Sequence, residues 1–418
     1  MEAPPDFGRF VLDQAKSERL VVQPRMGFAD PCHMRAGLVA TGSARAVTVG
    51  TITLDAHTRV GRFDLADQAL RSGIPLNGYP LVTHPLETTR WVTSVQNAEF
   101  PVQVRHGAAM PHEIFRILCT VPLTATEGGP VSYCLPYGRT PLSRSIESWS
   151  SCCRAFAGLR DRGVEPHLET FGGCMLGQLC PPSQLVALSV LEALFFVQHG
   201  IRSISVSYAQ QTSPEQDLDA VAALRRLCRR LLPRVEWHTV VYAYMGVYPK
   251  TTVGAARLLA EAVKLAVLSG AERLLVKTQV EAQRIPTIDE NVAALEEAAD
   301  FALTMTKSTK PVIDSDSQTY VEAATLVESV LELDNDIGVA LRKAFSRGRL
   351  DIPFCVHPDN KGATMSCIDE DGRLGWESIG ALPFGGSVGR GMERPRSAGR
   401  LLDALTYVQR KFDSGSEV

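Results

Sequence analysis

The sequence has no uninterrupted apolar run of the roughly 18 residues that a membrane-spanning helix needs. Its first residues, Met-Glu-Ala-Pro-Pro-Asp, contain neither a basic stretch nor an apolar core, so no secretory signal is predicted. Basic residues form no stripe with interleaved aromatics, and the net charge of the 418 residues is −3. These absences argue against a membrane location and against nucleic acid as a partner, and we expect a cytoplasmic protein.

The sequence also lacks the motifs that mark several common kinds of site. The ten cysteines include no Cys-x-x-Cys pair, so no structural metal site is predicted, and we expect reduced, buried thiols. No Walker A loop and no Gly-x-Ser-x-Gly elbow occur. The glycine-rich stretch 385–391 has no strand–helix context, which disfavours a dinucleotide-binding turn.

The sequence does contain a regular alternation of short apolar runs and helix-period segments. Eight runs are predicted as strands: 20–24, 46–53, 101–105, 123–126, 167–171, 203–207, 237–242 and 273–277. Helical periodicity is found at 111–119, 142–162, 183–199, 215–232 and 253–269. Such alternation implies parallel strands joined by right-handed crossovers, and eight units favour a closed (β/α)₈ barrel. An open, doubly wound sheet is the alternative.

The chain changes character after the eighth run. Residues 291–306 and 319–346 are long, charged and helical in pattern, and from residue 351 turns rich in Pro, Gly and Asp alternate with short apolar runs. We therefore expect a TIM-type α/β barrel over residues 1–287 and a helical and irregular C-terminal extension over residues 288–418. The extension is expected to pack on the barrel or on a partner.

Polar residues follow one predicted strand after another. Arg25, Arg59 and Arg105 each lie at or just beyond the end of an apolar run. In a barrel these ends meet at the C-terminal face, where barrel active sites lie. Three guanidinium groups at one mouth repel one another unless anions lie between them, and their forked geometry suits carboxylates or phosphate. The set predicts a site for a dicarboxylate or a phosphate, although each arginine alone could be an ordinary surface residue.

Four more residues near the same strand ends are candidates for the chemistry. Glu127 precedes two glycines, which let a ligand approach the backbone, and a carboxylate among arginines stays ionised and can bind an ammonium group. His106 could polarise a carboxylate or move a proton. Tyr133 and Tyr137 could offer hydroxyl groups to a substrate. The structural alternatives are a loop salt bridge for Glu127 and simple packing for the histidine and the tyrosines.

One motif comes close to a cobalamin-ligating signature and does not match it. The run Asp55-Ala-His57-Thr-Arg59-Val-Gly61 resembles Asp-x-His-x-x-Gly, but its glycine lies one residue too late and an arginine falls inside it. We therefore predict no cobalt ligand in this chain.

Seven longer motifs occur in a fixed order along the chain. They are Val22-Gln-Pro-Arg25-Met-Gly27, Asp55-Ala-His57-Thr-Arg59, Leu76-Asn77-Gly-Tyr-Pro, Gln103-Val-Arg105-His106-Gly, Glu127-Gly-Gly-Pro-Val-Ser-Tyr133-Cys-Leu-Pro136-Tyr137, Met245-Gly-Val-Tyr248-Pro and Val276-Lys277-Thr-Gln-Val-Glu281-Ala-Gln-Arg-Ile285-Pro-Thr. Together they resemble the large (epsilon) subunit of glutamate mutase, also called methylaspartate mutase. The similarity runs from about residue 20 to about residue 287, with a fainter match at Asp351-Ile-Pro-Phe.

This resemblance implies a barrel capped by a separate small subunit that carries the cobalamin. It also implies adenosylcobalamin as cofactor, an amino dicarboxylate as substrate, and pairing of this subunit with itself in a heterotetramer. The implied reaction interconverts glutamate and 3-methylaspartate. Homolysis of the cobalt–carbon bond yields an adenosyl radical, which takes a substrate hydrogen before a glycyl fragment migrates.

The resemblance also implies roles for individual residues. The family's arginine claw falls on Arg25, Arg59 and Arg105. The other substrate contacts, which are also the expected catalytic residues, fall on His106 beside the claw, on Glu127 at the substrate amino group, and on Tyr133 and Tyr137. Contacts to adenosylcobalamin fall on Gly27, Asn77, Pro136, Tyr248, Lys277, Glu281 and Ile285. Of these, Lys277 and Glu281 suit the ribose hydroxyls as donor and acceptor.

The sequence departs from the family pattern around the expected pocket. His57 replaces a tyrosine, Tyr242-Ala-Tyr244 replaces His-Gln-Trp, and Leu168-Glu169-Thr-Phe-Gly-Gly173 replaces Arg-Glu-Pro-Phe-Gly-Pro. Because the claw is retained, carboxylates are expected to be bound, but the substrate can differ from glutamate. The alternatives are a sister mutase for a modified dicarboxylate in specialised biosynthesis, and an inactive homologue that serves as a binding partner. The complete set of claw, Glu127 and Lys277 argues against an inactive homologue.

Overall fold

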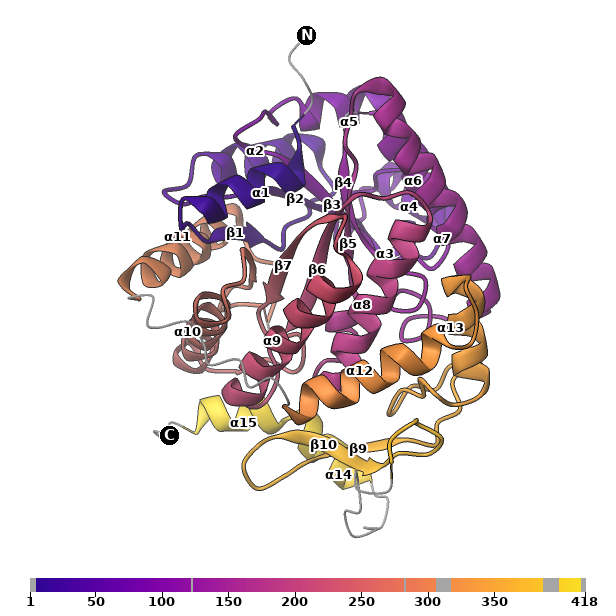
Figure 1. The fold of residues 1–418 in the computed structure, drawn as a ribbon. Coiled ribbons are helices and arrows are strands. Elements are labelled where there is room, and N and C mark those ends of the chain that lie inside the picture. Colours follow the sequence, from indigo (N-terminus) through magenta and orange to yellow (C-terminus); the bar gives the residue numbers. More distant parts are fainter. Residues whose placement is uncertain (1–4, 122, 282, 306–316, 386–397, 415–418) are drawn as a thin grey trace.

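A computed structural model describes residues 5–121, 123–281, 283–305, 317–385 and 398–414. Eight strands form its centre: β1 (Val21–Pro24), β2 (Gly50–Thr53), β3 (Val102–Arg105), β4 (Ala125–Gly128), β5 (His167–Thr170), β6 (Ser203–Ala209), β7 (Glu236–Tyr242) and β8 (Arg273–Val276). Each overlaps one predicted run, so the eight predicted strands are confirmed. Figure 1 shows the helices arranged around these strands.

The strands form a nearly closed barrel. Their order is β1-β8-β7-β6-β5-β4-β3-β2, and every neighbouring pair is parallel. β1 and β2 complete the circle through a parallel bridge between Val22 and Thr48, where Val22 N donates to Val47 O at 2.9 Å. The TIM-type barrel is therefore confirmed, and the open, doubly wound alternative is wrong.

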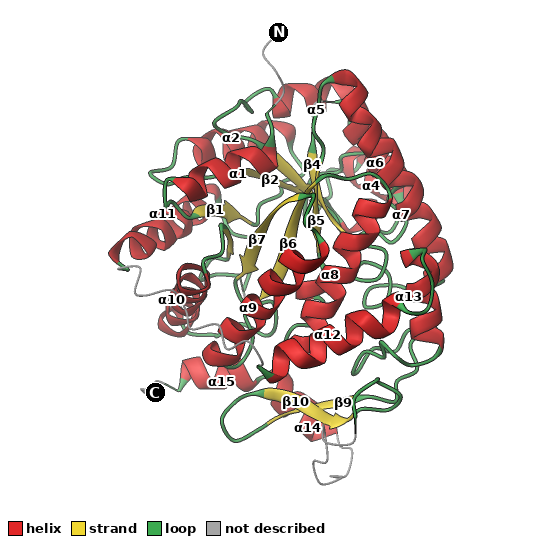
Figure 2. Cartoon of the chain, in the orientation of Figure 1, coloured by secondary structure: helices red, strands yellow, loops and turns green. Residues whose placement is uncertain are grey.

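Helices cover the outside of the barrel (Figure 2). Those that follow the strands in turn are α2 (Pro31–Gly42), α6 (His112–Thr120), α7 (Leu142–Ala157), α8 (Pro182–Gln198), α9 (Pro214–Leu231), α10 (Thr252–Ser269) and α11 (Ile288–Thr304). Three shorter helices lie between β2 and β3: α3 (Ala56–Arg59), α4 (Phe63–Arg71) and α5 (Leu86–Thr93). The helix predicted over 142–162 tightens at its end into a 3₁₀ turn, η1 (Gly158–Arg162).

Local sequence signals explain where helices near the mouth begin and end. Thr251 accepts a hydrogen bond from Gly254 N at the start of α10, and Gly270 ends that helix in the left-handed conformation, at φ 70°. Thr287 and Glu290 form a capping box at the start of α11. Such caps fix the points at which the connections leave the strand ends.

The interior of the barrel is polar and packed. Inward-facing side chains meet there in a layer that we call the floor: Gln23, Thr51, Gln103, Glu169, Ser205 and Arg273. Gln23 Nε2 donates to Thr51 at 2.9 Å and to Gln103 at 2.8 Å. Helix α1 (Phe7–Lys16) closes the N-terminal end, because the Phe7 ring lies 5.0 Å from the Arg273 guanidinium. The floor is thus sealed from below.

The C-terminal extension forms a further layer on one side of the barrel (Figure 1). It contains α12 (Gln318–Leu331), α13 (Ile337–Ser346), β9 (Met365–Ile368), β10 (Leu374–Ser378), α14 (Ala398–Leu405) and α15 (Tyr407–Asp413). The helical stretch expected over 319–346 is divided in two, because Asp336 leaves the helical conformation and caps α13 through Val339 N. The antiparallel hairpin of β9 and β10 was not predicted.

The extension borders the mouth of the barrel. His357 bonds Thr140 O at 3.0 Å in the loop after β4, and Gln409 of α15 donates to Tyr248 O at 2.8 Å beyond β7. Helix α11 packs against α2, α10 and β1, in the place of the eighth barrel helix. The predicted division at residue 287 stays a prediction.

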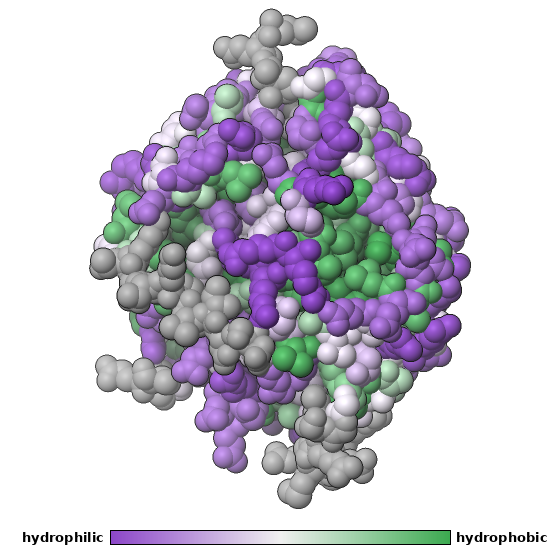
Figure 3. Space-filling model, viewed as in Figure 1, coloured by the Kyte–Doolittle hydropathy of each residue, from purple (hydrophilic) through white to green (hydrophobic). Residues whose placement is uncertain are grey.

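Other expectations concern the surface and the thiols. In the ranges that the structure describes, no helix combines the length and apolar character that a bilayer span requires. All ten cysteines are free and seven of them are buried, so the expected buried thiols are largely confirmed; Cys32 is exposed. Hydrophilic residues dominate the rim of the face shown in Figure 3. The glycine-rich stretch 385–391 lies outside the described residues except for Gly385.

Candidate active site at the barrel mouth

The structure brings four of the predicted substrate residues together at one end of the barrel. Arg105 ends β3 and His106 follows it, while Glu127 lies in β4 and Tyr133 in the loop beyond. Their relative exposures lie between 2% and 4%. This part of the site is therefore buried by the chain itself.

Arg105 and Glu127 form a buried ion pair. Nη1 of Arg105 lies 2.8 Å from Oε2 of Glu127 and donates to the Tyr242 hydroxyl at 2.9 Å. The guanidinium also lies over the Tyr242 ring, 4.9 Å from its centroid. Burial opposes the charge of Arg105, but Glu127 and the other acidic neighbours outweigh it and raise the Arg105 pKa well above its usual value. Arg105 is therefore a fixed positive charge.

A second carboxylate, Glu169 of β5, connects this pair to the floor. Its Oε2 accepts hydrogen bonds from Ser205 at 2.8 Å and from Gln103 at 3.2 Å. Arg273 also donates to Oε2, and the Tyr242 hydroxyl lies within hydrogen-bond reach of Oε1. Every side of this carboxylate is thus met by a donor.

The two carboxylates have opposite pKa shifts. Burial opposes the ionised form of Glu169, but Arg273 and Arg105 outweigh it and lower the Glu169 pKa to about 2. Burial raises the pKa of Glu127; Arg105 works against this effect and the charge of Glu169 adds to it. Glu169 is therefore the ionised member of the pair, and Glu127 is the carboxylate that can change its charge.

His106 presents an unfilled donor. Its Nδ1 accepts from Ala108 N at 3.1 Å, which assigns the ring proton to Nε2. Nε2 is buried and has no hydrogen-bond partner among the described residues. The ring stacks on Trp149 with centroids 5.6 Å apart, and burial together with Arg59 and Arg105 lowers the His106 pKa to about 3. His106 is therefore a neutral N–H donor.

The other two arginines of the predicted claw are held differently. Nε of Arg59 donates to Leu54 O at 2.8 Å, and its two terminal nitrogens have no partner in the described part of the chain. Burial and the charges of Arg25 and Arg105 lower the Arg59 pKa. Arg25 pairs with Glu281 at 2.8 Å, and its side chain is 35% exposed. The unfilled guanidinium of the mouth thus belongs to Arg59.

The two tyrosines lie at different depths. The hydroxyl of Tyr133 donates to Glu127 Oε1. Tyr137 is 54% exposed, and its ring centroid lies 6.4 Å from that of Tyr133. Tyr133 therefore orients Glu127, whereas Tyr137 lies at the surface.

Two of the residues expected at the adenosyl group also carry unfilled polar atoms. Lys277 follows β8, is 5% exposed, and has no hydrogen-bond partner among the described residues. Its ammonium lies 5.1 Å from the centroid of the Tyr248 ring. Burial and Arg25 lower the Lys277 pKa to about 8, with Glu281 opposing them. The Tyr248 hydroxyl is likewise buried without a partner in the described ranges.

The remaining expected cofactor residues have other contacts. Glu281 is engaged by Arg25, and Asn77 accepts from Ala56 N at 2.9 Å. Pro136 is half-buried and Ile285 is 54% exposed. A Cβ on Gly27 would lie 2.2 Å from Thr53 O, so packing alone requires glycine there. The structure therefore places these residues around the mouth without giving them a common contact.

Glu192 of α8 holds two loops of the site from behind. Its carboxylate accepts from Ser132 N at 2.9 Å, from Ser132 Oγ at 3.0 Å and from Gly172 N at 2.8 Å. A Cβ on Gly129 would lie 2.0 Å from this carboxylate, so the loop approaches it as closely as a glycine allows. Glu192 thus positions the loops that follow Glu127 and Glu169.

Sequence patterns did not identify four residues of this site. Tyr242 and Glu169 were noticed only as parts of segments that depart from the family pattern, and Arg273 and Glu192 were not noticed. The signal was a charge inside an apolar element: Glu192 is the lone charged residue in the seventeen residues of α8. Such a charge needs partners that only the tertiary structure supplies.

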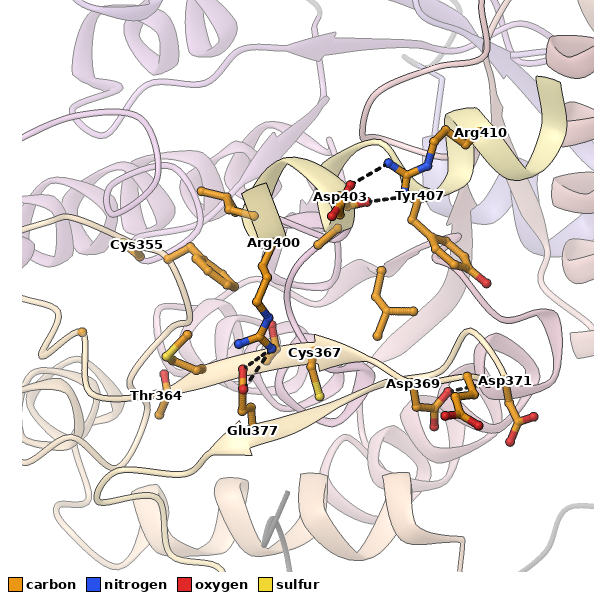
Figure 4. Close-up of a pocket in the computed structure, with 18 of the residues that line it drawn as sticks. Cys355, Thr364, Cys367, Asp369, Asp371, Glu377, Arg400, Asp403, Tyr407 and Arg410 are labelled. Atoms are coloured by element: carbon orange, nitrogen blue, oxygen red, sulfur yellow. Dashed lines mark hydrogen bonds and ion pairs between the residues drawn. The ribbon is translucent and has the colours of Figure 1, made fainter. Parts of the chain in front are cut away.

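A cavity of about 1120 Å³ lies elsewhere, in the C-terminal extension between the β9–β10 hairpin and α14 and α15 (Figure 4). Both of its arginines pair with carboxylates of the same cavity: Arg400 with Glu377 at 2.9 Å, and Arg410 with Asp403 at 3.0 Å. None of the predicted site residues is among its described lining residues. The unfilled donors point instead to the barrel mouth as the candidate active site.

The fold and the site define a class: a (β/α)₈ barrel whose C-terminal mouth brings arginine and N–H donors together beside a carboxylate. In the described residues, no group of three His, Cys, Asp or Glu side chains is arranged to hold a metal. Within that class, residues 4–397 match the family model of the methylaspartate mutase E chain, and the chain belongs to this family.

Relatives in several organisms agree with this assignment. The glutamate mutase epsilon subunit of Yersinia enterocolitica is 30% identical over 349 residues, which cover 79% of this chain and 72% of the relative. That of Halobacterium salinarum is 30% identical over 396 residues, or 91% of this chain and 82% of the relative. A solved aldolase from Escherichia coli K12 matches at a TM-score of 0.37 and 12% identity over 72% of this chain and 94% of that chain, which is too low to bear on the site.

Proposed function

We propose that the chain is the substrate-binding, catalytic subunit of an adenosylcobalamin-dependent carbon-skeleton mutase, an isomerase that interconverts glutamate and 3-methylaspartate. The observation that carries this proposal is the set of unfilled donors at the mouth. The terminal nitrogens of Arg59 and Nε2 of His106 lack partners in the described part of the chain, beside the fixed charge of Arg105. A dicarboxylate supplies the acceptors that these groups lack.

In this proposal the residues of the chain bind and orient the substrate. Arg25, Arg59 and Arg105 bind its two carboxylates, and His106 donates to one of them. Glu127, oriented by Tyr133, accepts from the substrate ammonium group. Tyr137 completes the pocket near the surface. Because most of these groups are buried, water is excluded and the reacting C–H bond is held in one place.

The groups left unfilled beyond β7 and β8 fit the cofactor. The ammonium of Lys277 and the hydroxyl of Tyr248 would hold the hydroxyl-rich adenosyl portion together with Glu281, and Gly27, Asn77, Pro136 and Ile285 would lie around it. When bound, adenosylcobalamin supplies a carbon-centred radical that takes a hydrogen from the substrate. We propose that a separate small cobalamin-binding subunit supplies the cobalt ligand, and that this chain pairs with itself in a heterotetramer. The relatives are named epsilon subunits, which supports a multi-subunit enzyme.

Reconstitution tests the proposal. The chain is mixed with a small subunit that carries an Asp-x-His-x-x-Gly motif, adenosylcobalamin is added, and formation of 3-methylaspartate from glutamate is measured. We expect conversion by the mixture and weak cobalamin binding by the chain alone. Stoichiometric cobalamin binding by the isolated chain would contradict the separate partner. Failure of a cobalamin-loaded complex to convert any amino dicarboxylate would contradict the mutase.

The wall of the pocket favours a second candidate, a sister mutase for a modified dicarboxylate. Tyr242 lies between Arg105 and Glu169, at a position where the resembling family carries a histidine. Its ring changes the shape of the pocket but leaves the claw intact. Turnover of glutamate and of substituted glutamates by the same complex separates the two candidates, since a sister mutase prefers a substituted one.

A further inference from the structure

The hydroxyl of Tyr242 lies between two buried carboxylates. It is 2.9 Å from Oε2 of Glu127 and also in contact with Oε1 of Glu169. Arg105 donates to the oxygen of the Tyr242 hydroxyl at 2.9 Å. A phenol carries one proton, so it can donate to only one of the two carboxylates at a time.

The surroundings decide which carboxylate receives that proton. Glu169 is held in its ionised form by Arg273, with Ser205 and Gln103 as further donors on Oε2, so its Oε1 is a charged acceptor for the Tyr242 proton. Glu127 has Tyr133 on one oxygen and the Arg105 charge on the other. When the Tyr242 hydroxyl donates to Glu169, it has no second proton for Glu127. Oε2 of Glu127 then receives no hydrogen bond from Tyr242.

We propose, on the basis of the mutase function above, that Tyr242 is a positioning residue that commits its proton to Glu169 and so keeps Glu127 available for the substrate ammonium group. The hydroxyl also accepts from Arg105 and holds that guanidinium over the ring. One side chain thus gives two adjacent carboxylates different roles.

The proposal makes ammonium binding depend on pH. The titratable groups around Tyr242 are Arg105 from β3, Glu127 from β4, Glu169 from β5 and Cys174 from the short 3₁₀ turn Gly172–Cys174. Only Glu127 among them has a carboxyl pKa raised by burial, so the acidic limb of amino-acid binding reports its ionisation. Loss of the Tyr242 hydroxyl removes the acceptor that Arg105 shares with Glu127, so the guanidinium pairs more fully with Glu127 and stabilises its ionised form.

The test compares Tyr242→Phe with Tyr244→Phe. Tyr244 is a matched control, because it is a buried tyrosine two residues away whose hydroxyl has no partner among the described residues. Binding of glutamate and of glutarate, which lacks the ammonium group, is measured by calorimetry on the full chain with its small subunit, from pH 5 to pH 9. In Tyr242→Phe we expect glutamate affinity to fall about 10-fold, because Arg105 then competes with the substrate ammonium group for Glu127, and we expect the acidic limb to move to lower pH. Glutarate binding should change less, and Tyr244→Phe should match the wild type for both ligands.

Two other outcomes separate this inference from the function on which it rests. Wild-type chain that binds glutarate as tightly as glutamate would overturn the ammonium role of Glu127, whereas the mutase function is tested separately by conversion of glutamate in the reconstituted complex. Glutamate binding by Tyr242→Phe with an unshifted pH profile would overturn the role of Tyr242 alone. If Tyr242→Phe does not fold, the wild type still tests the step on which the inference rests: an acidic limb for glutamate that is absent for glutarate supports ammonium binding by ionised Glu127, and equal limbs overturn the inference.

Discussion

Two buried arginine–glutamate pairs lie one above the other in this barrel and differ in how completely they are satisfied. In the floor, Arg273 and Glu169 are met by Gln23, Gln103 and Ser205, so each charge has partners on several sides. At the mouth, Arg105 and Glu127 lie beside donors that have no partner in the described ranges. An arginine–glutamate pair is therefore structural in the floor, where the chain supplies hydrogen-bond partners to the groups around it. At the mouth, where some of these groups lack partners, such a pair is suited to ligand recognition.

The cost of burial explains why the floor needs so many partners. Removing two charges from water costs more than their attraction returns unless hydrogen bonds satisfy the remaining atoms. The residues of the floor come from six strands, so their hydrogen bonds also fix how these strands are aligned. At the mouth, the described residues do not satisfy all of the hydrogen-bond donors. An acidic ligand that accepts from these donors offsets the cost of burying the charges, and this gain contributes to its binding free energy.

The largest effect is expected from breaking the floor pair. Arg273→Met leaves Glu169 buried without its main partner, and we expect a loss of about 3–5 kcal/mol in the free energy of unfolding, measured by urea denaturation. Arg9→Met is the control, because Arg9 pairs with Asp13 at the surface with its side chain 57% exposed, and we expect at most about 1 kcal/mol. Equal losses in the two variants would show that the floor pair contributes no more than a surface pair.

At the mouth, Arg105→Lys should reduce activity more than stability. Lysine keeps the charge but lacks the planar fork, so we expect about 2–4 kcal/mol less transition-state stabilisation, measured as kcat/KM in the reconstituted complex. Arg62→Lys, at the surface pair with Asp64, serves as the control and should leave kcat/KM unchanged. An unchanged kcat/KM in Arg105→Lys would remove this arginine from the site.

Glu127→Gln and Glu169→Gln should fail in different ways. The first removes the acceptor for the ammonium group but leaves the claw, so we expect kcat to fall about 10²-fold with a modest change in KM and in melting temperature. The second leaves Arg273 without its partner, so we expect a lower melting temperature. Normal kcat with a lowered melting temperature in Glu127→Gln would show that Glu127 only orders its loop.

The smallest effect concerns pH at Lys277. Its folded-state pKa of about 8 lies below the ordinary 10.5, so the folded state disfavours the ammonium form. The folded chain bears this penalty in full below pH 8 and loses it as the pH rises toward 10.5. We therefore expect the stability of Lys277→Met relative to wild type to be about 2 kcal/mol greater at pH 7 than at pH 9.5. A difference that does not vary with pH would show that Lys277 is not desolvated.

Most of the barrel could be predicted because its strands are local apolar runs and its helices have a local period. The hairpin of β9 and β10 could not, since only part of each of its strands is buried, whereas the four-residue strands of the barrel are buried throughout. The break in the helical stretch 319–346 depends on one cap, Asp336, in a segment that otherwise favours helix.

The site was predictable where a polar residue follows a strand, as Arg105 does, or stands near its end, as Glu127 does. Glu169 and Arg273 lie within strands, and their partners come from other strands at sequence distances of up to 250 residues. No local pattern carries information on that scale. The unfilled state of His106 Nε2 is also a property of the folded chain, because it depends on which nitrogen Ala108 N reaches.

The contact between Arg273 and Gln23 has a consequence for synthesis. It spans 250 residues, so the floor stays incomplete until the last strand leaves the ribosome, about 10–50 s after the first at usual translation rates. During that interval Glu169 has no arginine partner in the floor, and a barrel of seven strands would enclose an uncompensated negative charge. The nascent chain therefore gains little from closing the barrel early. Closure becomes favourable once Arg273 is available, while 145 residues of the chain still follow it.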